Sequence, residues 1–240
     1  MLFFFMDLWN SIVMPVFRLT QQLAFPPPHL ATKEGLLAVG GDLHPERLLL
    51  AYKQGIFPWY SEGEPILWWS PDPRLVLFPE ELNVSRSLRK TIRKSIYTIT
   101  FDRAFEHVIQ ACANVRLDKS EGTWITLDMQ NAYCRLHELG FAHSVECWHE
   151  SNLVGGLYGV SLGRVFFGES MFSTMNDASK VCLVSLVAFM LENHFTIIDC
   201  QVATDHLIRM GARTIPRRDF LSHLYIAIQY PSISGKWSNK

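Results

Sequence analysis

Residues 143–170, HSVECWHESNLVGGLYGVSLGRVFFGES, decide the fold of the larger part of the chain. They contain three runs rich in apolar, β-branched and aromatic residues, and short polar or glycine-containing turns separate these runs. Runs of this kind joined by tight turns are typical of neighbouring antiparallel strands. The stretch therefore predicts an antiparallel meander with strands at His143–His149, Leu153–Val160 and Arg164–Ser170.

The segments on both sides of this meander continue a mixed α/β pattern. A long apolar helix is expected at Ala178–Glu192, followed by a further strand at Thr196–Val202. Before the meander, Asp128–Leu139 predicts a helix that ends at Gly140. Further strands are expected at 74–78 and 97–101, and further helices at 84–94 and 102–113. This mixture predicts an α/β fold.

Residues 25–74 have a different composition, because Pro and Gly recur within otherwise apolar sequence. Examples are FPPP at 25–28, GLLAVGGDL at 35–43 and WWSPDPR at 68–74. Pro and Gly at this density interrupt long elements, although one helix is expected at Pro45–Gln54. We therefore expect a small N-terminal domain at 23–74, a larger domain at 75–240 and, at 1–22, an extension outside both.

The expected extension begins with the apolar sequence MLFFFMDLWNSIVMPVF. No basic region precedes its apolar residues, Asp7 interrupts them, no small-residue cleavage site follows, and the segment is too short to span a bilayer. We interpret it as neither a signal peptide nor a membrane anchor, and we expect a cytoplasmic protein. A translation start at Met1 and one at Met14 are both compatible with the sequence.

The composition predicts an ordered globular protein without a cofactor. Hydrophobic residues make up 48% of the chain and charged residues 19%, which argues against disorder. The five cysteines form no C-x-x-C pair, so we expect reduced thiols rather than a zinc site or a disulfide framework. The sequence contains neither a P-loop nor a G-x-G-x-x-G motif, and no nucleotide cofactor is therefore expected.

Residues of metal-ligand type occur close together at His143, Glu146, Cys147 and His149. On a β-strand, Glu146 would point away from His143 and His149, because successive side chains alternate between the two faces. The set therefore does not converge, and no metal site is predicted there.

A basic segment, SRSLRKTIRK at 85–94, contrasts with the formal net charge of −1 for the whole chain. Its cations recur at helical spacing and share one helix face: Arg86, Arg89, Lys90, Arg93 and Lys94. Leu88, Ile92 and Ile96 form a separate apolar stripe that can anchor the helix. Like charges on one face repel each other unless a polyanion compensates them, which indicates a phosphate-contacting helix. An ordinary solvated helix face is the alternative.

Polar residues also occur inside two predicted strands. Glu169 lies among aromatic residues and Met in VFFGESMF, and Asp199 and Gln201 lie among Ile and Val in TIIDCQV. Burying a carboxylate in such surroundings is costly unless it is paired or hydrogen-bonded. At positions i and i+2 of a strand, Asp199 and Gln201 are expected on the same face. These three residues are therefore candidate catalytic groups, with structural hydrogen bonding inside the sheet as the alternative.

Several long blocks of the sequence resemble those of the leucyl/phenylalanyl-tRNA–protein transferases, in a single register from about Phe25 to about Leu224. The blocks are GLLAVGGDL at 35–43, YKQGIFPWYS at 52–61, ILWWSPDPR at 66–74, EGTWIT at 121–126, LHELGFAHSVE at 136–146, LVGGLYGV at 153–160, GESMFS at 168–173, IDCQV at 198–202 and IPRRDF at 215–220. The resemblance implies a small N-terminal domain joined to an acetyltransferase-like (GNAT) α/β domain.

The resemblance also implies an activity. Leu or Phe, and less readily Met, would move from aminoacyl-tRNA to the α-amine of proteins that begin with Arg or Lys, which marks them for bacterial N-end-rule degradation. No metal or cofactor is implied, and we expect a monomer. Carried over by motif, the catalytic candidates are Asp199, Gln201 and Glu169, and the basic segment matches the family's tRNA-binding cluster. The substrate-binding candidates are Trp59, Trp124, Leu157, Phe166, Ser170, Met171 and Phe189.

The donor in this reaction is already an activated ester, so the enzyme has to hold a neutral amine against the ester carbonyl. We expect the amine to hydrogen-bond to Gln201, with Asp199 orienting that amide. Because Gln is a very poor base, the proton acceptor stays open between water, a carboxylate and the terminal ribose hydroxyl. The role of Glu169 stays open between holding the acceptor's basic side chain and ordering the pocket. Trp59 and Trp124 are predicted to stack on the terminal adenosine.

Two other classes of protein remain as alternatives. A coenzyme A-dependent N-acyltransferase on the same fold would bind pyrophosphate at a Gly-rich turn, but residues 173–180 read STMNDASK and contain no glycine. A non-enzymatic RNA-binding module would use the basic helix alone, and it would leave Glu169, Asp199 and Gln201 unexplained.

Overall fold

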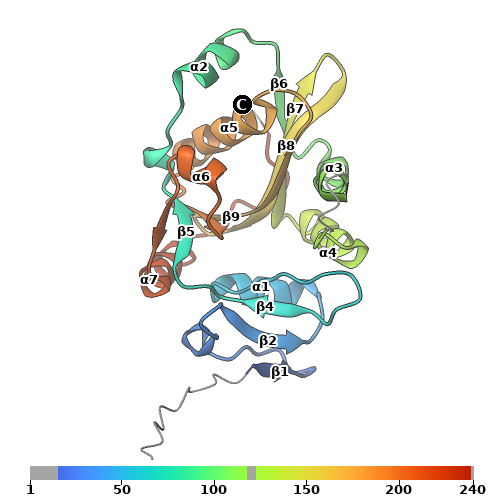
Figure 1. The fold of residues 1–240 in the computed structure, drawn as a ribbon, viewed down its shortest axis with the longest axis vertical. Coiled ribbons are helices and arrows are strands. Elements are labelled where there is room, and N and C mark those ends of the chain that lie inside the picture. Colours follow the sequence, from blue (N-terminus) through green and yellow to red (C-terminus); the bar gives the residue numbers. More distant parts are fainter. Residues whose placement is uncertain (1–15, 118–122, 239–240) are drawn as a thin grey trace, which may run out of the picture.

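Two β-sheets organise the chain, and the smaller sheet lies at one end of the larger one (Figure 1). The computed structural model describes residues 16–117 and 123–238. Helices and strands alternate through most of this length. The expected α/β fold with a smaller N-terminal unit is therefore confirmed.

The smaller sheet has the strand order β1-β2-β4-β3. Its strands are β1 (Phe17–Leu19), β2 (Leu36–Gly40), β3 (Phe57–Pro58) and β4 (Leu67–Trp69). Helix α1 (Pro45–Lys53) connects β2 to β3, and Gly55 follows it with a φ of +70°. A Cβ atom on Gly55 would lie 2.6 Å from the side chain of Leu221. Glycine is therefore needed both for the left-handed turn and for the close approach to the C-terminal part of the chain.

Strand β1 begins inside residues 1–22, which we expected to lie outside the fold. Phe17–Leu19 pairs in parallel with β2. The buried guanidinium of Arg47 then donates to the carbonyl oxygens of Thr20 and Gln22 at 3.0 and 3.2 Å. This part of the expected extension therefore belongs to the smaller sheet, whereas the first fifteen residues lie outside the described part of the chain.

The larger sheet has the strand order β11-β5-β10-β9-β8-β7-β6. The predicted antiparallel meander is confirmed as β7, β8 and β9. The expected strand after it, β10, lies parallel to β9, and the long apolar helix α5 connects the two. The strands are β5 (Arg74–Leu77), β6 (Thr98–Phe101), β7 (Ala142–His149), β8 (Asn152–Leu162), β9 (Val165–Ser173), β10 (Ile197–Gln201) and β11 (Arg213–Ile215).

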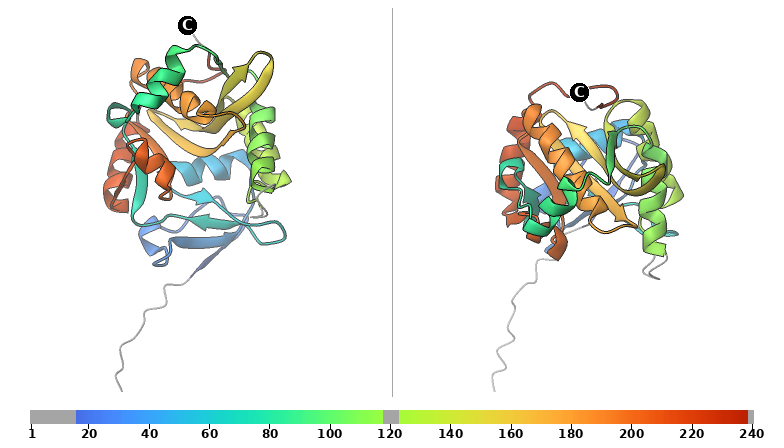
Figure 2. Two further views of the ribbon diagram at one scale, coloured as in Figure 1. Left: turned by 45° about the horizontal axis from the view of Figure 1, so that its top comes forward. Right: turned by 90° about the horizontal axis from the view of Figure 1, so that it is seen from above.

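Helices cover both faces of the larger sheet (Figure 2). Helix α5 packs on β7 and β8 from one face, and Gly155 permits this contact, because a Cβ atom there would lie 2.6 Å from that of Ala178. Helices α3 and α4 pack on the other face, so a separate hydrophobic cluster forms on each side. The helices of this part are α2 (Arg86–Arg93), α3 (Phe105–Leu117), α4 (Leu127–Glu138), α5 (Ala178–Glu192), α6 (Asp205–Arg209) and α7 (Arg217–Ala227).

Two of the expected helices begin later than the sequence pattern suggested. Helix α2 begins at Arg86, because the Ser85 hydroxyl caps it by accepting the backbone N–H of Leu88. Helix α3 begins three residues after the expected Asp102, which has a φ of +53° and is buried. Its carboxylate accepts the backbone N–H of Ser144 at 2.9 Å and so belongs to the sheet. None of the described helices has the length and apolar character needed to cross a membrane.

Candidate active site

A cavity of about 500 Å³ opens where β9 and β10 separate. The two strands pair only from Ile197 to Asp199, opposite Val165 to Phe167, and the chain beyond diverges. Side chains from both faces of the sheet therefore reach the cavity. Leu183 and Leu186 of α5 line it on one side, and Phe57 and Pro58 of β3 line it on the other.

Each of the two strands carries a bulge at the mouth of this opening. In β9, Tyr158 pairs with Ser170 and Gly159 pairs with Gly168, which leaves Glu169 without a register partner. A Cβ atom on Gly159 would lie 2.1 Å from the Phe167 carbonyl oxygen, so only glycine fits opposite the bulge. A bulge bends a strand and re-aims a side chain. Here it turns Glu169 to the cavity wall.

Strand β10 is also irregular, between Asp199 and Gln201. Gln201 has a φ of +58°, a left-handed conformation that costs a non-glycine residue roughly 1–2 kcal/mol. Its backbone N–H donates to the Asp199 carboxylate at 3.0 Å. Gln201 lines the cavity, whereas the fully buried Asp199 does not. The expected i, i+2 relationship of a regular strand therefore does not describe this pair.

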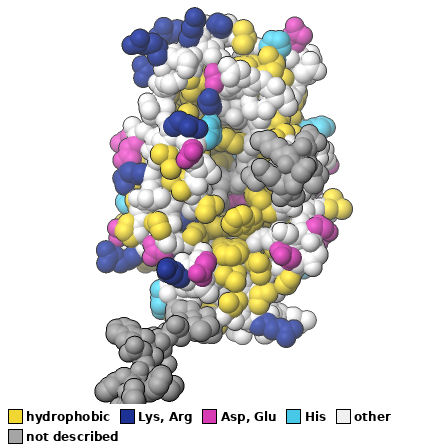
Figure 3. Space-filling model, viewed as in Figure 1, with side chains coloured by type: hydrophobic (Ala, Val, Ile, Leu, Met, Phe, Trp, Pro, Cys, Tyr) yellow, Lys and Arg dark blue, Asp and Glu magenta, His cyan; other side chains and the backbone are white. Residues whose placement is uncertain are grey.

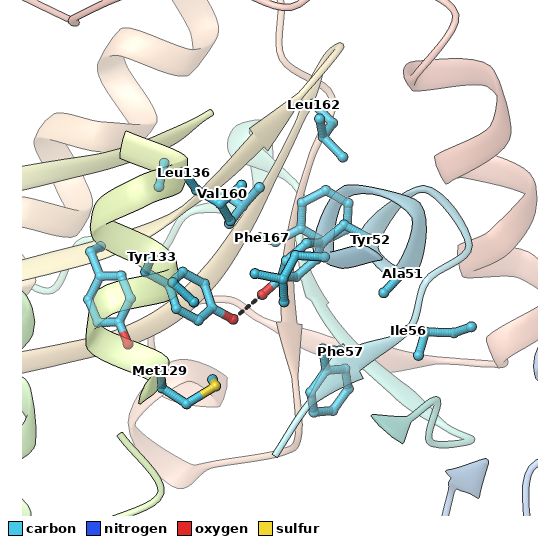
Figure 4. Packing of buried hydrophobic residues seen from close by; sticks show 14 of the residues in the cluster. Ala51, Tyr52, Ile56, Phe57, Met129, Tyr133, Leu136, Val160, Leu162 and Phe167 are labelled. Atoms are coloured by element: carbon cyan, nitrogen blue, oxygen red, sulfur yellow. Dashed lines mark hydrogen bonds between the residues drawn. The ribbon is translucent and has the colours of Figure 1, made fainter. Parts of the chain in front are cut away.

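Glu169 is held by groups from three separate elements. Its carboxylate accepts from the Tyr52 hydroxyl of α1 at 2.7 Å, the Tyr133 hydroxyl of α4 at 3.0 Å and the Gln201 amide nitrogen at 3.1 Å. The two tyrosine hydroxyls also contact each other, as Figure 4 shows. Tyr52, Tyr133 and Glu169 thus form three hydrogen bonds with one another, and each bond needs one donated proton. The two hydroxyls supply only two protons. The triangle of Tyr52, Tyr133 and Glu169 is therefore complete only when the carboxyl carries a proton.

The electrostatic surroundings of Glu169 agree with this proton count. Burial and, to a smaller extent, the charge of nearby Asp199 raise the pKa of Glu169, while the bonds from the two tyrosines and Gln201 lower it. The net result is a pKa of about 7. Burial, with the Glu169 charge second, also raises the pKa of Tyr52 and of Tyr133 well above their usual range. Near neutral pH, Glu169 can therefore both take up and release a proton while the tyrosines remain protonated.

Asp199 is paired with a cation that the sequence analysis did not select. Arg74, the first residue of β5, donates from Nε and Nη2 to the two Asp199 oxygens at 2.8 and 2.6 Å. Both side chains are almost completely buried, with exposed fractions of 1% and 0%. The pairing with Arg74 compensates the Asp199 charge inside the protein.

The cavity walls contain most of the predicted substrate-binding residues. The predicted residues that line it are Trp59, Trp124, Leu157, Phe166, Ser170 and Met171, in addition to Glu169 and Gln201. Trp59 is 41% exposed and its ring lies 5.9 Å from that of Trp69. Figure 3 shows hydrophobic side chains gathered on this face, between the larger and smaller units.

Phe189 was expected in the pocket but does not line the cavity. Its partly buried ring lies 4.5 Å from that of Trp237 and 5.3 Å from that of Phe101, and it packs against the hydrophobic cluster on the α5 side of the sheet. The α5 residues that reach the cavity are Leu183 and Leu186, and Phe189 lies one turn further along the helix. Because α5 is apolar on every side, its periodicity does not reveal which positions face the cavity.

The basic helix α2 lies away from this cavity, at the opposite end from the smaller sheet (Figure 1). All five of its predicted cations are exposed, and none forms an ion pair with another described residue. Leu88 is buried and anchors the helix, while the Thr91 hydroxyl donates to Asp177 at 3.1 Å. Figure 3 shows the resulting cluster of basic side chains at this end of the molecule.

The four residues considered as metal ligands do not converge on a common point. His143 Nδ1 lies 2.8 Å from the Asp102 carboxylate. Glu146 accepts from the hydroxyls of Ser144 and Thr100. In the described ranges, no group of three or more residues is arranged to hold a metal ion.

Comparisons with known proteins assign a family to this arrangement. The model of the family described as leucyl/phenylalanyl-tRNA protein transferase matches residues 76–225, and the model of its N-terminal domain matches residues 41–72. The leucyl/phenylalanyl-tRNA–protein transferase of Syntrophobacter fumaroxidans is 65% identical over 211 residues, which are 88% of this chain and 90% of that protein. That of Desulforapulum autotrophicum is 57% identical over 224 residues, 93% of this chain and 98% of that protein.

A comparison with solved structures finds acetyltransferases at low similarity. An aminoglycoside acetyltransferase from an uncultured soil metagenomic sample has a TM-score of 0.39 and 12% identity, over 48% of this chain and 84% of that chain. A GCN5-related N-acetyltransferase from Kribbella flavida has a TM-score of 0.35 and 12% identity, over 72% of this chain and 61% of that chain.

Proposed function

The chain belongs to the leucyl/phenylalanyl-tRNA–protein transferase family, and we propose that it transfers leucine or phenylalanine, and less readily methionine, from aminoacyl-tRNA to proteins that begin with Arg or Lys. The protein is an aminoacyltransferase. Its products would carry destabilising N-termini for N-end-rule degradation, and we propose that it acts in the cytoplasm as a monomer without metal or cofactor. The observation that carries the proposal is an apolar cavity with Glu169 and Gln201 in its wall.

The cavity suits the aminoacyl end of the donor. Its apolar lining, including Leu157, Phe166 and Met171, would take the leucine or phenylalanine side chain. Selection of this kind is imperfect, because a missing methylene changes binding by only about 1–3 kcal/mol. Trp59 and Trp124 would hold the terminal adenosine by stacking, a contact worth about 1–3 kcal/mol per base. The exposed cations of α2 would hold the tRNA backbone without reading its sequence.

The hydrogen bonds of Gln201 support a specific place for the acceptor amine. The Gln201 amide nitrogen is engaged with Glu169, so its carbonyl oxygen Oε1 is the acceptor atom left for an incoming N–H. An amine bound there would lie beside Glu169, which can take its proton. The neutral amine nitrogen would attack the ester carbonyl carbon and pass this proton to Glu169 as the tetrahedral intermediate forms. As the bond to the ribose oxygen breaks, Glu169 would return the proton to that oxygen.

The first experiment would supply purified protein with radiolabelled Phe-tRNA and a model protein beginning with Arg, without ATP or coenzyme A. Acid-stable label on the acceptor, and none on the same acceptor with an acetylated N-terminus, is the expected result. Label on the acceptor when radiolabelled acyl-CoA replaces Phe-tRNA, and none from labelled Phe-tRNA, would instead support the N-acyltransferase alternative. Binding of Phe-tRNA without any transfer would leave the RNA-binding module.

A further inference from the structure

Arg74 and Asp199 form a buried unit whose hydrogen bonds lead to Gln201. Both Asp199 oxygens accept from Arg74, and Oδ1 also accepts the Gln201 backbone N–H. The guanidinium carbon of Arg74 lies 4.7 Å from the ring centroids of both Phe57 and Phe220. The Arg74 side chain is therefore held between two rings, and it fixes Asp199 in turn.

Gln201 depends on this support more than a regular strand residue would. Its left-handed backbone, with a φ of +58°, is unfavourable for a residue with a side chain, and the register of β10 with β5 is interrupted just before it. The bond from the Gln201 N–H to Asp199 is the side-chain contact that stabilises this conformation. The same conformation places the Gln201 amide 3.1 Å from Glu169.

We propose that Arg74 is a positioning residue of the transfer reaction: it fixes Asp199, and Asp199 holds the Gln201 backbone so that the Gln201 side chain meets both Glu169 and the acceptor amine. The inference rests on the function proposed above for Gln201. It assigns Asp199 a structural task in place of direct contact with the reacting atoms. Asp199 does not line the cavity, and its oxygens are occupied by Arg74 and the Gln201 N–H.

The test removes the two charges singly and together. Arg74→Met or Asp199→Asn alone leaves one buried charge without its partner, and kcat is expected to fall by roughly tenfold or more, with the KM for Phe-tRNA little changed. The double variant Arg74→Met/Asp199→Asn removes both charges, and the amide oxygen of the introduced asparagine can still accept the Gln201 N–H. Its kcat is expected to exceed that of either single variant. Arg74→Met/Asp199→Leu also removes both charges, but leucine cannot accept the Gln201 N–H. Its kcat is expected to stay as low as that of the single variants.

The chain contains a matched control pair. Arg213 donates from Nε and Nη2 to the two Glu81 oxygens at 2.8 and 3.2 Å, and its guanidinium carbon lies 4.6 Å from the Phe78 ring centroid, but this pair is exposed. Arg213→Met/Glu81→Gln is therefore expected to keep wild-type kcat. A folded Arg74→Met variant with wild-type kcat would overturn the proposal, as would a folded Arg74→Met/Asp199→Asn variant no faster than the single ones.

Hydrogen exchange at the Gln201 backbone N–H gives a readout that does not depend on activity. This backbone N–H is expected to exchange slowly in the wild type and in Arg74→Met/Asp199→Asn, and faster in Arg74→Met/Asp199→Leu. Fast exchange in the wild type would refute the positioning role even if transfer occurs. Slow exchange in a wild type that transfers nothing would instead contradict the proposed function and leave the positioning of Gln201 intact.

Discussion

The opening between β9 and β10 and the basic helix α2 handle charge in opposite ways. At the opening, Glu169 and Asp199 are each held by side chains from other elements, and Asp199 is fully buried. On α2, five cations stand exposed without an ion-pair partner among the described residues. A buried charge has to be partnered and is fixed in place, while an exposed one costs little and interacts over a distance. Because the two regions are distinct, we expect the proposed chemistry and the proposed tRNA binding to be separable by mutation.

The largest separation is expected from Glu169→Gln. This change keeps the side-chain shape but removes the group that we propose takes the amine proton, so kcat should fall by roughly 10²–10⁴-fold. The KM for Phe-tRNA should change little, because the cavity walls and α2 are intact. Single-turnover transfer rates and a tRNA-binding isotherm on the same preparation would measure both quantities.

The matched control for this variant is Gln110→Ala, which truncates an exposed polar side chain on α3. It should reproduce both wild-type values. A Glu169→Gln protein with unchanged kcat would remove Glu169 from the chemistry and restore water or the ribose hydroxyl as the proton acceptor.

The sequence alone predicts elements that local interactions specify better than elements that depend on pairing with other segments. The meander, α5 and α2 were predictable, because local apolar runs, turn residues and helical charge spacing specify them. The short strands of the smaller sheet were not predicted. Phe57–Pro58 is too short to show an alternating pattern, and Leu67–Trp69 is stabilised by pairing with β2 as well as with Phe57–Pro58.

The catalytic candidates were predictable only in part. Glu169 and Gln201 were selected because a polar side chain inside an apolar strand needs a reason. Tyr52, Tyr133 and Arg74 were missed, because each looks like an ordinary core or strand-end residue until the fold brings it to Glu169 or Asp199. The bulges in β9 and β10 have no recognisable local signal apart from the glycines at 159 and 168.

On α2, Arg89→Ala/Lys90→Ala should weaken tRNA binding and leave kcat at saturating donor unchanged. Each lost phosphate contact should lower the slope of log K against log salt by about 1. Arg135→Ala on α4 removes another exposed arginine and serves as the control, with an unchanged slope. Affinity for the donor tRNA, measured at several salt concentrations for the wild type and both variants, gives these slopes. An unchanged slope in the α2 variant would return that helix to the class of solvated surface helices.

A smaller effect is expected from Tyr52→Phe, which removes a hydrogen bond that lowers the pKa of Glu169. The Glu169 pKa, about 7 in the wild type, should move upward. Because the ionised carboxylate is the proposed proton acceptor, kcat/KM rises with pH through this pKa. The rise should therefore occur at higher pH in the variant, with a few-fold loss near neutrality. A pH–rate profile of both proteins would show the direction, and a shift to lower pH would contradict the assignment.

The same group should affect stability with a definite sign. The folded-state pKa of Glu169, about 7, lies above its ordinary value of 4.5. The stability that this shift contributes is therefore fully present below the ordinary value and is lost as pH rises through about 7. The wild type should lose thermal stability relative to Glu169→Gln as pH increases over this window. Melting curves of both proteins across it test the sign, and parallel curves would mean that the carboxyl is not perturbed.

The smallest effect on donor choice is expected from Phe189→Leu, and it tests where the cavity ends. Phe189 packs against Trp237 and Phe101 on the α5 side of the sheet, so the change should lower the free energy of unfolding by up to about 1.5 kcal/mol. The ratio of leucine to phenylalanine transfer should stay at its wild-type value. Met171 lines the cavity, so Met171→Ala widens it and should change that ratio. Competition between Leu-tRNA and Phe-tRNA measures it. A changed ratio in Phe189→Leu would mean that the amino-acid pocket extends one helical turn beyond Leu186, into the core that now holds Trp237.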